Sequence, residues 1–308
     1  PVAGFILKRL GQMVLTVFLV ATVVFLVLRV LPGDPAAVIA GIDAEDSRLE
    51  QIRERLGTDR PVTEQYLSWL HGALRLDLGR SFFDNAPVSA LIAERLPVTL
   101  ILAGSAFLLS LLIAVPLGVA GGLGRKSPLA AVAALYEYVA LALPPFLMGL
   151  LLLLIFAVTF RLLPMFGAGG AAHFILPSLA LALGNAAVLS RVTKAAVLEE
   201  MEKGYVVTAR SLGLPKGRIL FGEVLRNALT PLITVAGLQV GYLLGGAIIV
   251  EELFSLPGVG SLLVGAILSR DFPVVQGCVM LVAVAFVLAN SVADLLYAVA
   301  DPRGRSRG

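Results

Sequence analysis

Few residues of this chain have the types and spacing that a catalytic or metal site requires. His71 and His173 are its only histidines and lie far apart in the sequence, and Cys278, its one cysteine, is in a third place. Metal sites are built from clustered histidine, cysteine or carboxylate ligands, and no such set forms here. A nucleophile elbow and a pair of catalytic carboxylates are also absent. The residues therefore argue against an enzyme and against a bound metal.

One segment, Gly121-Gly122-Leu123-Gly124-Arg125-Lys126-Ser127, approaches the pattern of a phosphate-binding loop. In that pattern a glycine directly precedes the lysine, and the loop follows a strand. Here Arg125 precedes Lys126, and the segment ends a long apolar run. We interpret it as a loop that leaves the membrane, so this chain is expected to bind neither ATP nor any other cofactor.

Polar side chains inside apolar runs are the remaining candidates for function. They are Glu137, Asn185, Asn290 and Asp294. A charge at the centre of a span costs about 2.5 to 3.5 kcal/mol on insertion scales, so such groups should face other helices or water. They either line a translocation path or form hydrogen bonds between helices, with an interfacial position as a further reading for Glu137 and Asp294.

The elements that position these residues are long apolar runs. The chain of 308 residues is 58% hydrophobic and 15% charged, with a mean hydropathy of +0.93. Runs of about 20 apolar residues can cross a bilayer as helices, whereas a membrane barrel would show short alternating segments. The sequence therefore predicts an all-α, polytopic membrane protein with six transmembrane helices. The runs cover residues 11–31, 98–122, 132–160, 174–190, 231–250 and 274–297.

Proline and glycine mark places where these helices bend or approach closely. Pro116 lies in the second run, and Pro144 and Pro145 lie in the third, where each removes a backbone donor and should bend the helix. Gly237, Gly241, Gly245 and Gly246 form a stripe that permits close packing in the fifth run. Asn185, Asn290, Pro144 and Pro145 are therefore predicted to take part in a translocation path or in helix–helix contacts.

The distribution of Lys and Arg assigns the two sides of the membrane. Fourteen of the 24 basic residues fall on the side of the two termini, nine fall on the other, and Arg29 lies at a helix end. The richer side is cytoplasmic by the positive-inside rule, so both termini are expected there. The first run is too long for a signal peptide and lacks a small-residue cleavage site, so we expect it to be retained.

Two polar segments interrupt the apolar runs. Residues 32–97 are expected outside, with one short helix to Leu56, capped by Asp46 or Ser47 and stopped by Gly57, and a second over residues 62–76 that buries Tyr66, Leu67, Trp69 and Leu70. Residues 191–228 are basic and cytoplasmic, with helices over 193–201 and 205–212. Gly213 should end the latter in a left-handed conformation, with Pro215 preventing its continuation.

Several motifs, in order along the whole chain, resemble those of one family. Near the N-terminus they are Leu7-Lys8-Arg9-Leu10, Leu28-Arg29-Val30-Leu31-Pro32-Gly33-Asp34-Pro35, Asp77-Leu78-Gly79-Arg80-Ser81 and Glu94-Arg95-Leu96-Pro97. Later they are Tyr205-Val206-Val207-Thr208-Ala209-Arg210-Ser211-Leu212-Gly213-Leu214, Leu225-Arg226-Asn227-Ala228-Leu229-Thr230-Pro231, Leu253-Phe254-Ser255-Leu256-Pro257-Gly258, Arg270-Asp271-Phe272-Pro273-Val274-Val275-Gln276-Gly277 and Asp294-Leu295-Leu296-Tyr297. The chain resembles the membrane subunits of binding-protein-dependent ABC importers, in the dipeptide, oligopeptide and nickel branch.

This resemblance implies a type I ABC importer permease fold in a bacterial inner membrane. It implies residues 1–96 as a transmembrane helix plus external segment, 97–300 as the core of five helices with a coupling loop at 191–228, and 301–308 as a tail. Residues implied to couple the chain to an ATPase are Tyr205, Thr208, Ala209, Arg210, Gly213, Leu214, Arg226, Asn227 and Pro231. Thr208 and Arg210 replace the Glu and second Ala of the general family pattern, as is usual in this branch.

The implied partners are a second, similar permease, two cytoplasmic ATPase subunits that bind ATP and Mg, an external solute-binding protein and membrane lipid, with no nucleic acid. The implied solute is a short peptide, with nickel or a nickel chelate as the alternative, because His173 follows a glycine-rich turn. A self-contained secondary transporter is the rival class, but it would call for inverted repeats and an intramembrane ion site.

Overall fold

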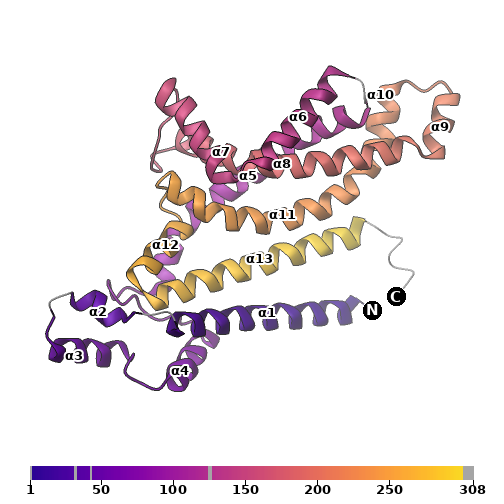
Figure 1. Cartoon of the computed structure of the whole chain (residues 1–308). Coiled ribbons are helices and arrows are strands. Elements are labelled where there is room, and N and C mark those ends of the chain that lie inside the picture. The colour runs from indigo at the N-terminus through magenta and orange to yellow at the C-terminus, as the bar shows by residue number, and fades with distance from the viewer. Residues whose placement is uncertain (1, 31–32, 42–43, 124–126, 301–308) are drawn as a thin grey trace. The chain divides into compact units, whose positions relative to one another are not determined.

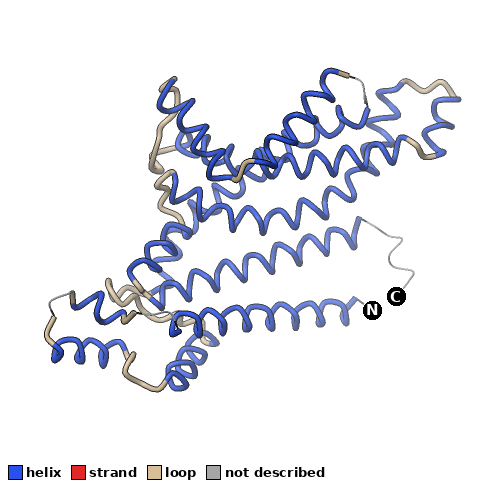
Figure 2. Tube along the Cα trace, in the orientation of Figure 1, coloured by secondary structure: helices blue, strands red, loops and turns tan. Residues whose placement is uncertain are grey.

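Helices are the main secondary structure of the part of the chain that the structure describes, and loops join them. A computed structural model describes residues 2–30, 33–41, 44–123 and 127–300, with side chains over residues 11–293 of these ranges. No strand occurs there, only an isolated bridge between Arg80 and Pro87 (Figure 2). The helices are α1 (Val2–Val30), α2 (Pro35–Ala40), α3 (Asp46–Leu56), α4 (Val62–Leu74), α5 (Val88–Leu123), α6 (Pro128–Ala142), α7 (Pro145–Leu152), the π-helix η1 (Leu153–Thr159), α8 (Ala171–Met201), α9 (Gly204–Ser211), α10 (Lys216–Arg218), the π-helix η2 (Ile219–Val224), α11 (Leu225–Leu253), α12 (Val259–Ser269) and α13 (Phe272–Ala300).

Five helices are long and apolar enough to cross a membrane, and the pair α6 and α7–η1 makes six if it is one broken span. These are the six runs that the sequence predicts. Their ends differ, because α5 begins at Val88 and α8 continues to Met201. The helix expected over residues 193–201 is therefore the end of α8. The eleven-residue α12 was not predicted, because its apolar run is too short to span a bilayer.

The chain forms two compact units. One contains residues Pro1–Leu100 and Ser255–Val287, and the other contains Ile101–Phe254 and Leu288–Gly308. The boundary between the units falls inside α5 and inside α13, so each of these helices has one end in the first unit and the other end in the second. The division therefore groups segments that are distant in sequence.

In the first unit, α4 packs on α1 through aromatic rings. The ring centroids of Phe25 and Tyr66 lie 5.1 Å apart, and those of Phe25 and Trp69 lie 5.5 Å apart. Tyr66 and Trp69 are partly buried as expected, but Leu67 is 63% exposed, which corrects the prediction. The rings of Tyr66 and Trp69 share one helix face, and Leu67 follows on another.

Three of the quoted motifs meet in this unit. Asp271 accepts hydrogen bonds from Ser81 Oγ at 2.5 Å and from the backbone of Phe82 at 3.1 Å. Gly33 has a φ of +125° and lies against the guanidinium of Arg270, so a side chain there would be strained and would displace the end of Arg270. The segment before α2 and the segment after α4 thus both contact the residues that immediately precede α13.

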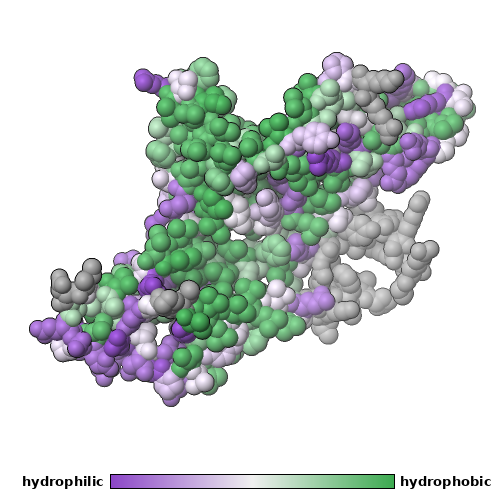
Figure 3. Space-filling view, in the orientation of Figure 1, coloured by the Kyte–Doolittle hydropathy of each residue, from purple (hydrophilic) through white to green (hydrophobic). Residues whose placement is uncertain are grey.

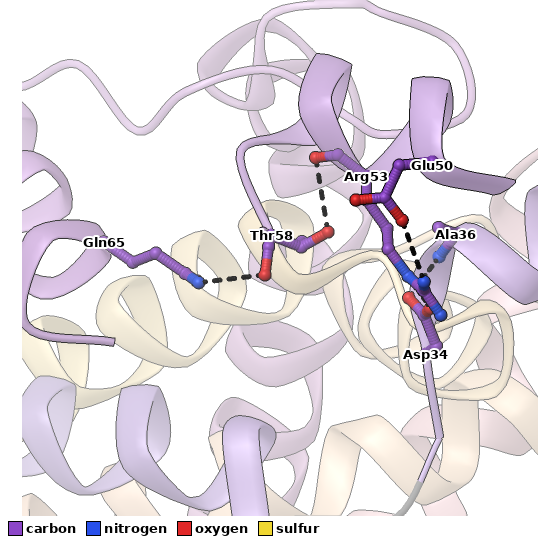
Figure 4. A network of polar contacts seen from close by, with 6 residues as sticks. All are labelled: Asp34, Ala36, Glu50, Arg53, Thr58 and Gln65. Atoms are coloured by element: carbon purple, nitrogen blue, oxygen red, sulfur yellow. Dashed lines mark hydrogen bonds and ion pairs between the residues drawn. The ribbon is translucent and has the colours of Figure 1, made fainter. Parts of the chain in front are cut away.

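Helix ends in this unit follow ordinary capping chemistry. Asp34 caps α2 by accepting from the backbone of Ala36 at 2.9 Å, and it also accepts from Arg53 Nε at 2.7 Å, which raises the pKa of Arg53 (Figure 4). Gly57 ends α3 in the left-handed conformation, with φ of 68°, as predicted. The predicted cap by Asp46 or Ser47 is wrong, because Glu45 stands at that position without a side-chain bond.

In the second unit, α8 packs against α6, α7 and α11 (Figure 1). The sequence predicts a bend in the third apolar run, and the structure shows a complete break. The helices α6 and α7–η1 meet at 110° across Leu143 and Pro144. Gly118 and Gly122 let α5 approach α8, because a Cβ on them would lie 2.5 Å from Thr193 Cβ and 2.7 Å from Val197 Cγ1. Neither glycine was assigned a packing role from the sequence.

The predicted glycine stripe of α11 packs only in part. A Cβ on Gly237 would lie 2.1 Å from Ala293 Cβ of α13, and one on Gly246 would lie 3.0 Å from Leu181 of α8. A Cβ on Gly245 would meet nothing within 4 Å. The stripe therefore serves two different neighbours instead of one interface.

Candidate functional site

The connection between α8 and α11 carries the residues that the sequence predicts for coupling. Its short helix α9 begins three residues after α8 ends. Val206 and Ala209 point into a buried apolar cluster that includes Ile219 and Val224 of η2. Tyr205 and Leu214 pack against the same cluster. One side of α9 is thus fixed to the rest of the unit by apolar burial.

Gly213 ends α9 in the conformation that the sequence predicts. Its φ is 74°, in the left-handed region that glycine adopts without penalty. The backbone N–H of Gly213 donates to Arg210 at 3.0 Å, and that of Leu214 donates to Ala209 at 3.2 Å. This pair of bonds, with Leu214 packed on the apolar cluster, is the Schellman motif. The turn out of α9 is therefore tightly defined.

A polar network fastens the start of α9 to the end of α8. Glu200, which is 8% exposed, accepts from Tyr205 Oη at 2.6 Å and from Lys203 Nζ. Asn227 Nδ2 of α11 donates to Tyr205 Oη at 3.4 Å. Burial first, and then the bond to Glu200, raises the pKa of Tyr205, so its hydroxyl remains a donor at neutral pH. The same carboxylate raises the pKa of Lys203.

The opposite side of α9 is exposed and carries apolar groups. Val207 is 56% exposed, Leu212 75% and Phe221 of η2 71%. Thr208, Arg210 and Ser211 are exposed beside them. In Figure 3 the end of the molecule that Figure 1 labels α9 shows many hydrophilic residues beside hydrophobic ones. We call Val207, Thr208, Arg210, Ser211, Leu212 and Phe221 the α9 surface. Large apolar side chains in a polar setting are typical of a contact site for another protein.

The structure separates the nine predicted coupling residues by role. Tyr205 and Asn227 join in the network, Ala209 and Leu214 pack inward, and Gly213 forms the turn. Thr208 and Arg210 lie on the α9 surface. Arg226 and Pro231 are exposed on α11, where Pro231 lies inside the helix. Glu200 and Phe221 were missed, because a glutamate and an apolar residue in a basic segment give no signal by themselves.

A second candidate site lies at the break of the third apolar run. Pro144, Pro145, Asn185, Gln239 and Tyr242 line a cavity of about 430 Å³. Asn185, only 1% exposed, donates from Nδ2 to Ser110 Oγ at 3.0 Å, while its Oδ1 has no partner in the described part of the chain. Three of the four residues predicted for a path or for helix contacts therefore share one cavity.

Asn290, the fourth such residue, does not line this cavity. Its Oδ1 is likewise buried without a partner. Glu137 of α6 is 4% exposed, accepts from Ser190 Oγ of α8 at 2.7 Å, and lies 3.7 Å from Arg191 Nε. Glu137 is thus held by interhelical contacts, which is one of the three readings that its sequence position allows. The side chain of Asp294 lies outside the described residues.

Over the described residues, no group of three or more histidine, cysteine, aspartate or glutamate side chains is placed to hold a metal ion. His173 Nδ1 is buried and has no partner among the residues described, and a Cβ on Gly169 would lie 2.9 Å from its ring. The glycine-rich turn therefore packs directly on the imidazole.

Two family models match the chain. Residues 114–306 match the model described as binding-protein-dependent transport system inner membrane component, and residues 2–103 match the N-terminal model of such membrane components. A protein of Brucella abortus (strain 2308) that carries a provisional name as a peptide transport system permease is 40% identical, over 97% of this chain and 98% of its own. The glutathione transport system permease protein GsiC of Escherichia coli O6:H1 is 37% identical over the same shares.

Solved structures share the fold at low identity. A chain of the MetNI methionine ABC transporter in an inward-facing conformation has a TM-score of 0.59 at 17% identity, covering 69% of this chain and 97% of that one. A chain of an amino acid ABC transporter solved with histidines has a TM-score of 0.53 at 19% identity, covering 69% of this chain and 94% of that one.

Proposed function

This chain belongs to the family of binding-protein-dependent transport system inner membrane components, and we propose that it forms the translocation path of an importer for short peptides. Membership makes it a non-catalytic permease subunit of an ABC transporter, multi-pass in the inner membrane of bacteria, with ATPase partners. The solute class rests on relatives named for peptide and glutathione transport. Glutathione is itself a short peptide, so the two names agree in chemistry.

The α9 surface carries the mechanical part of the proposal. We take it as the contact with an ATPase subunit, because α9 is fixed on one side by buried apolar groups and exposes Val207, Leu212 and Phe221 on the other. Such a helix can transmit a displacement without unfolding. The ATPase shifts the permease between conformations only if it binds one of them more tightly than the other.

The complete assembly in this proposal has one further permease of the same family, two ATPase subunits and an external solute-binding protein. The termini and α9 face the cytoplasm, and α3 and α4 face the outside. ATP and Mg bind to the ATPase subunits, and this chain holds no cofactor. The cavity at Pro144 and Pro145 serves as part of the path, with Asn185 Oδ1 as an acceptor for a peptide N–H.

Reconstitution tests the function directly. The complex of this chain with its partner permease and ATPases, in proteoliposomes with the external protein added, is expected to accumulate a labelled dipeptide only with ATP. Mass spectrometry of the solute that co-purifies with the external protein identifies the natural substrate. Uptake by this chain alone without ATP would refute the ATP-driven mechanism. A nickel chelate that co-purifies in place of a peptide would refute the peptide substrate.

A further inference from the structure

A second cavity of about 430 Å³ lies wholly within the first unit. It is bounded by the outer end of α1, by α3 and α4, by residues 77–82 and by the start of α13. Its volume is in the range of small-ligand sites. None of the residues predicted for coupling or for the path lines it.

Two donor side chains that line this cavity, Gln276 and Arg29, are incompletely paired. Gln276 of α13 is 4% exposed, lines the cavity, and its Nε2 has no partner among the residues that the structure describes. Leaving a buried donor unpaired costs about 1 to 3 kcal/mol. We therefore take the unpaired N–H of Gln276, a residue that lines the cavity, as a donor for an acceptor that binds there.

Arg29 is the second donor, and its charge has no counter-ion among the described residues. Its Nε donates to Gln65 Oε1 at 3.2 Å, its Nη1 donates to Phe25 O at 3.4 Å, and its guanidinium lies 3.6 Å from the centroid of the Phe25 ring. Gln65 is held in turn by the carbonyl of Thr58, at 3.3 Å from its Nε2 (Figure 4). The guanidinium is thus held in place while its charge remains uncompensated.

The outer part of the cavity has a different character. Exposed Glu54, Glu64 and Asp77 lie there together with exposed Arg55, Arg60 and Arg80. Trp69 forms part of the wall. A ligand with a carboxylate for Arg29 and an ammonium group for Glu54, Glu64 or Asp77 would find opposite charge for both of its groups.

We propose that this cavity binds a small zwitterion, an amino acid or a short peptide, whose carboxylate accepts from Arg29 and from Gln276 Nε2. The site is separate from the path cavity and does not depend on the proposed transport function, which only suggests a dipeptide as the probe. Charge-assisted bonds to a carboxylate are among the stronger hydrogen bonds in proteins, so two of them give useful affinity.

The chain carries its own reporter for this test, because Trp69 is its only tryptophan. The purified full chain in maltoside micelles would be titrated with alanyl-alanine, with alanyl-alanine amide and with propionate while Trp69 fluorescence is followed. We expect a saturable change with alanyl-alanine, and half-saturation at about tenfold or more higher concentration with the amide, which lacks the carboxylate charge. Propionate, which lacks the ammonium group, is expected to bind more weakly as well.

Variants separate binding from folding. Gln276→Met removes the unpaired donor and is expected to weaken alanyl-alanine binding about tenfold. Gln276→Glu, which places a carboxylate against the ligand's own, abolishes binding. Gln51→Met, at an exposed position of α3 outside the cavity, is the matched control and leaves binding unchanged. An unchanged Trp69 emission maximum before titration verifies the fold of each variant.

Four outcomes would overturn the proposal: no saturable response to alanyl-alanine, an equal response to its amide, full binding by Gln276→Met, or binding of propionate as tight as that of the dipeptide. Phosphatidylglycerol added to the micelles provides one more arm, and a Trp69 response to that lipid alone would make the cavity a headgroup site instead. The assay needs neither ATP nor partner subunits, so its failure is distinct from a failure of peptide uptake.

Discussion

Gly213 bears the sharpest backbone constraint on the α8–α11 connection. A β-branched residue at its φ of 74° costs about 1 to 2 kcal/mol, and the Schellman bonds to Arg210 and Ala209 would be strained. We expect Gly213→Val to keep the complex assembled but to lower dipeptide uptake per ATP hydrolysed. Uptake and phosphate release measured on the same proteoliposomes give this ratio.

Gly217 provides the control for that change. It lies in α10 of the same connection, with open space around its Cα and no left-handed φ. Gly217→Val should therefore leave the ratio near that of the parent chain, and Gly213→Asn, which tolerates the left-handed region, should restore most of it. A normal ratio in Gly213→Val would contradict the role given to this turn.

Tyr205 ties α9 to both neighbouring helices through one hydroxyl. Tyr205→Phe keeps the ring on the apolar cluster but removes the bonds to Glu200 and Asn227, and a hydrogen bond to a charged group contributes about 1.5 to 3 kcal/mol. We expect faster amide hydrogen exchange across α9 and a severalfold loss of coupled uptake. Hydrogen exchange with mass spectrometry on the assembled complex measures the first effect.

Tyr138→Phe is the comparison for Tyr205→Phe, because Tyr138 is 69% exposed on α6 and its ring, not its hydroxyl, contacts Arg191. Equal protection of α9 in Tyr205→Phe and Tyr138→Phe would show that the hydroxyl contributes nothing to the position of the helix.

The roles of residues that depend on local backbone conformation could be predicted from the sequence. The roles of residues that depend on contact with a distant part of the chain could not. Gly57 and Gly213 follow helical segments directly, so their left-handed stops can be derived from local pattern. Glu200 has its role only because α9 folds back on α8. No local pattern contains that geometry.

At the scale of elements, the contact between α5 and α8 depends on glycines that the sequence analysis passed over. A Cβ on Gly118 would lie 2.5 Å from Thr193 Cβ and 2.7 Å from the backbone oxygen of Ser190, so the helices would have to separate. Overpacking of this kind costs about 1 to 3 kcal/mol. We expect Gly118→Ala to lower the thermal stability of the purified complex.

Gly104 tests whether that loss comes from packing. It lies on the same helix with nothing within 4 Å of an added Cβ, and alanine is about 1 kcal/mol better than glycine in a helix. Gly104→Ala should therefore be neutral or stabilising. The same melting temperature in both variants would mean that α5 and α8 do not pack this closely.

The third apolar run shows how far element prediction reaches. Two adjacent prolines predict a bend, because each lacks a backbone donor and the second restricts the residue before it. The turn of 110° and the π-helix η1 that follows are not local properties. They depend on the packing of α7 against α8 and α11, where a Cβ on Gly149 would lie 2.8 Å from Leu253.

At the scale of the whole chain, the order of motifs identified the family where single motifs could not. The motifs around Ser81 and Asp271 are explained by contacts, since Asp271 binds Ser81 and Phe82 across about 190 residues of sequence. Contacts of that separation are fixed by the tertiary fold alone. The candidate spans could be predicted from hydropathy, because a helix in lipid needs a long run of apolar residues and such runs are visible in the sequence.

Sidedness is the whole-chain property that rests on charge alone, with fourteen basic residues assigned to one side and nine to the other. It can be tested with cysteines, because the native Cys278 is fully buried and should react little. Ser211→Cys places a thiol on exposed α9, and Thr63→Cys places one on exposed α4. A membrane-impermeant maleimide added to intact cells should label Thr63→Cys, and should label Ser211→Cys only after the membrane is opened. The reverse pattern would put the α9 surface outside, beyond the reach of a cytoplasmic ATPase, and the coupling mechanism proposed for α9 would then be untenable even though the fold and the family would remain.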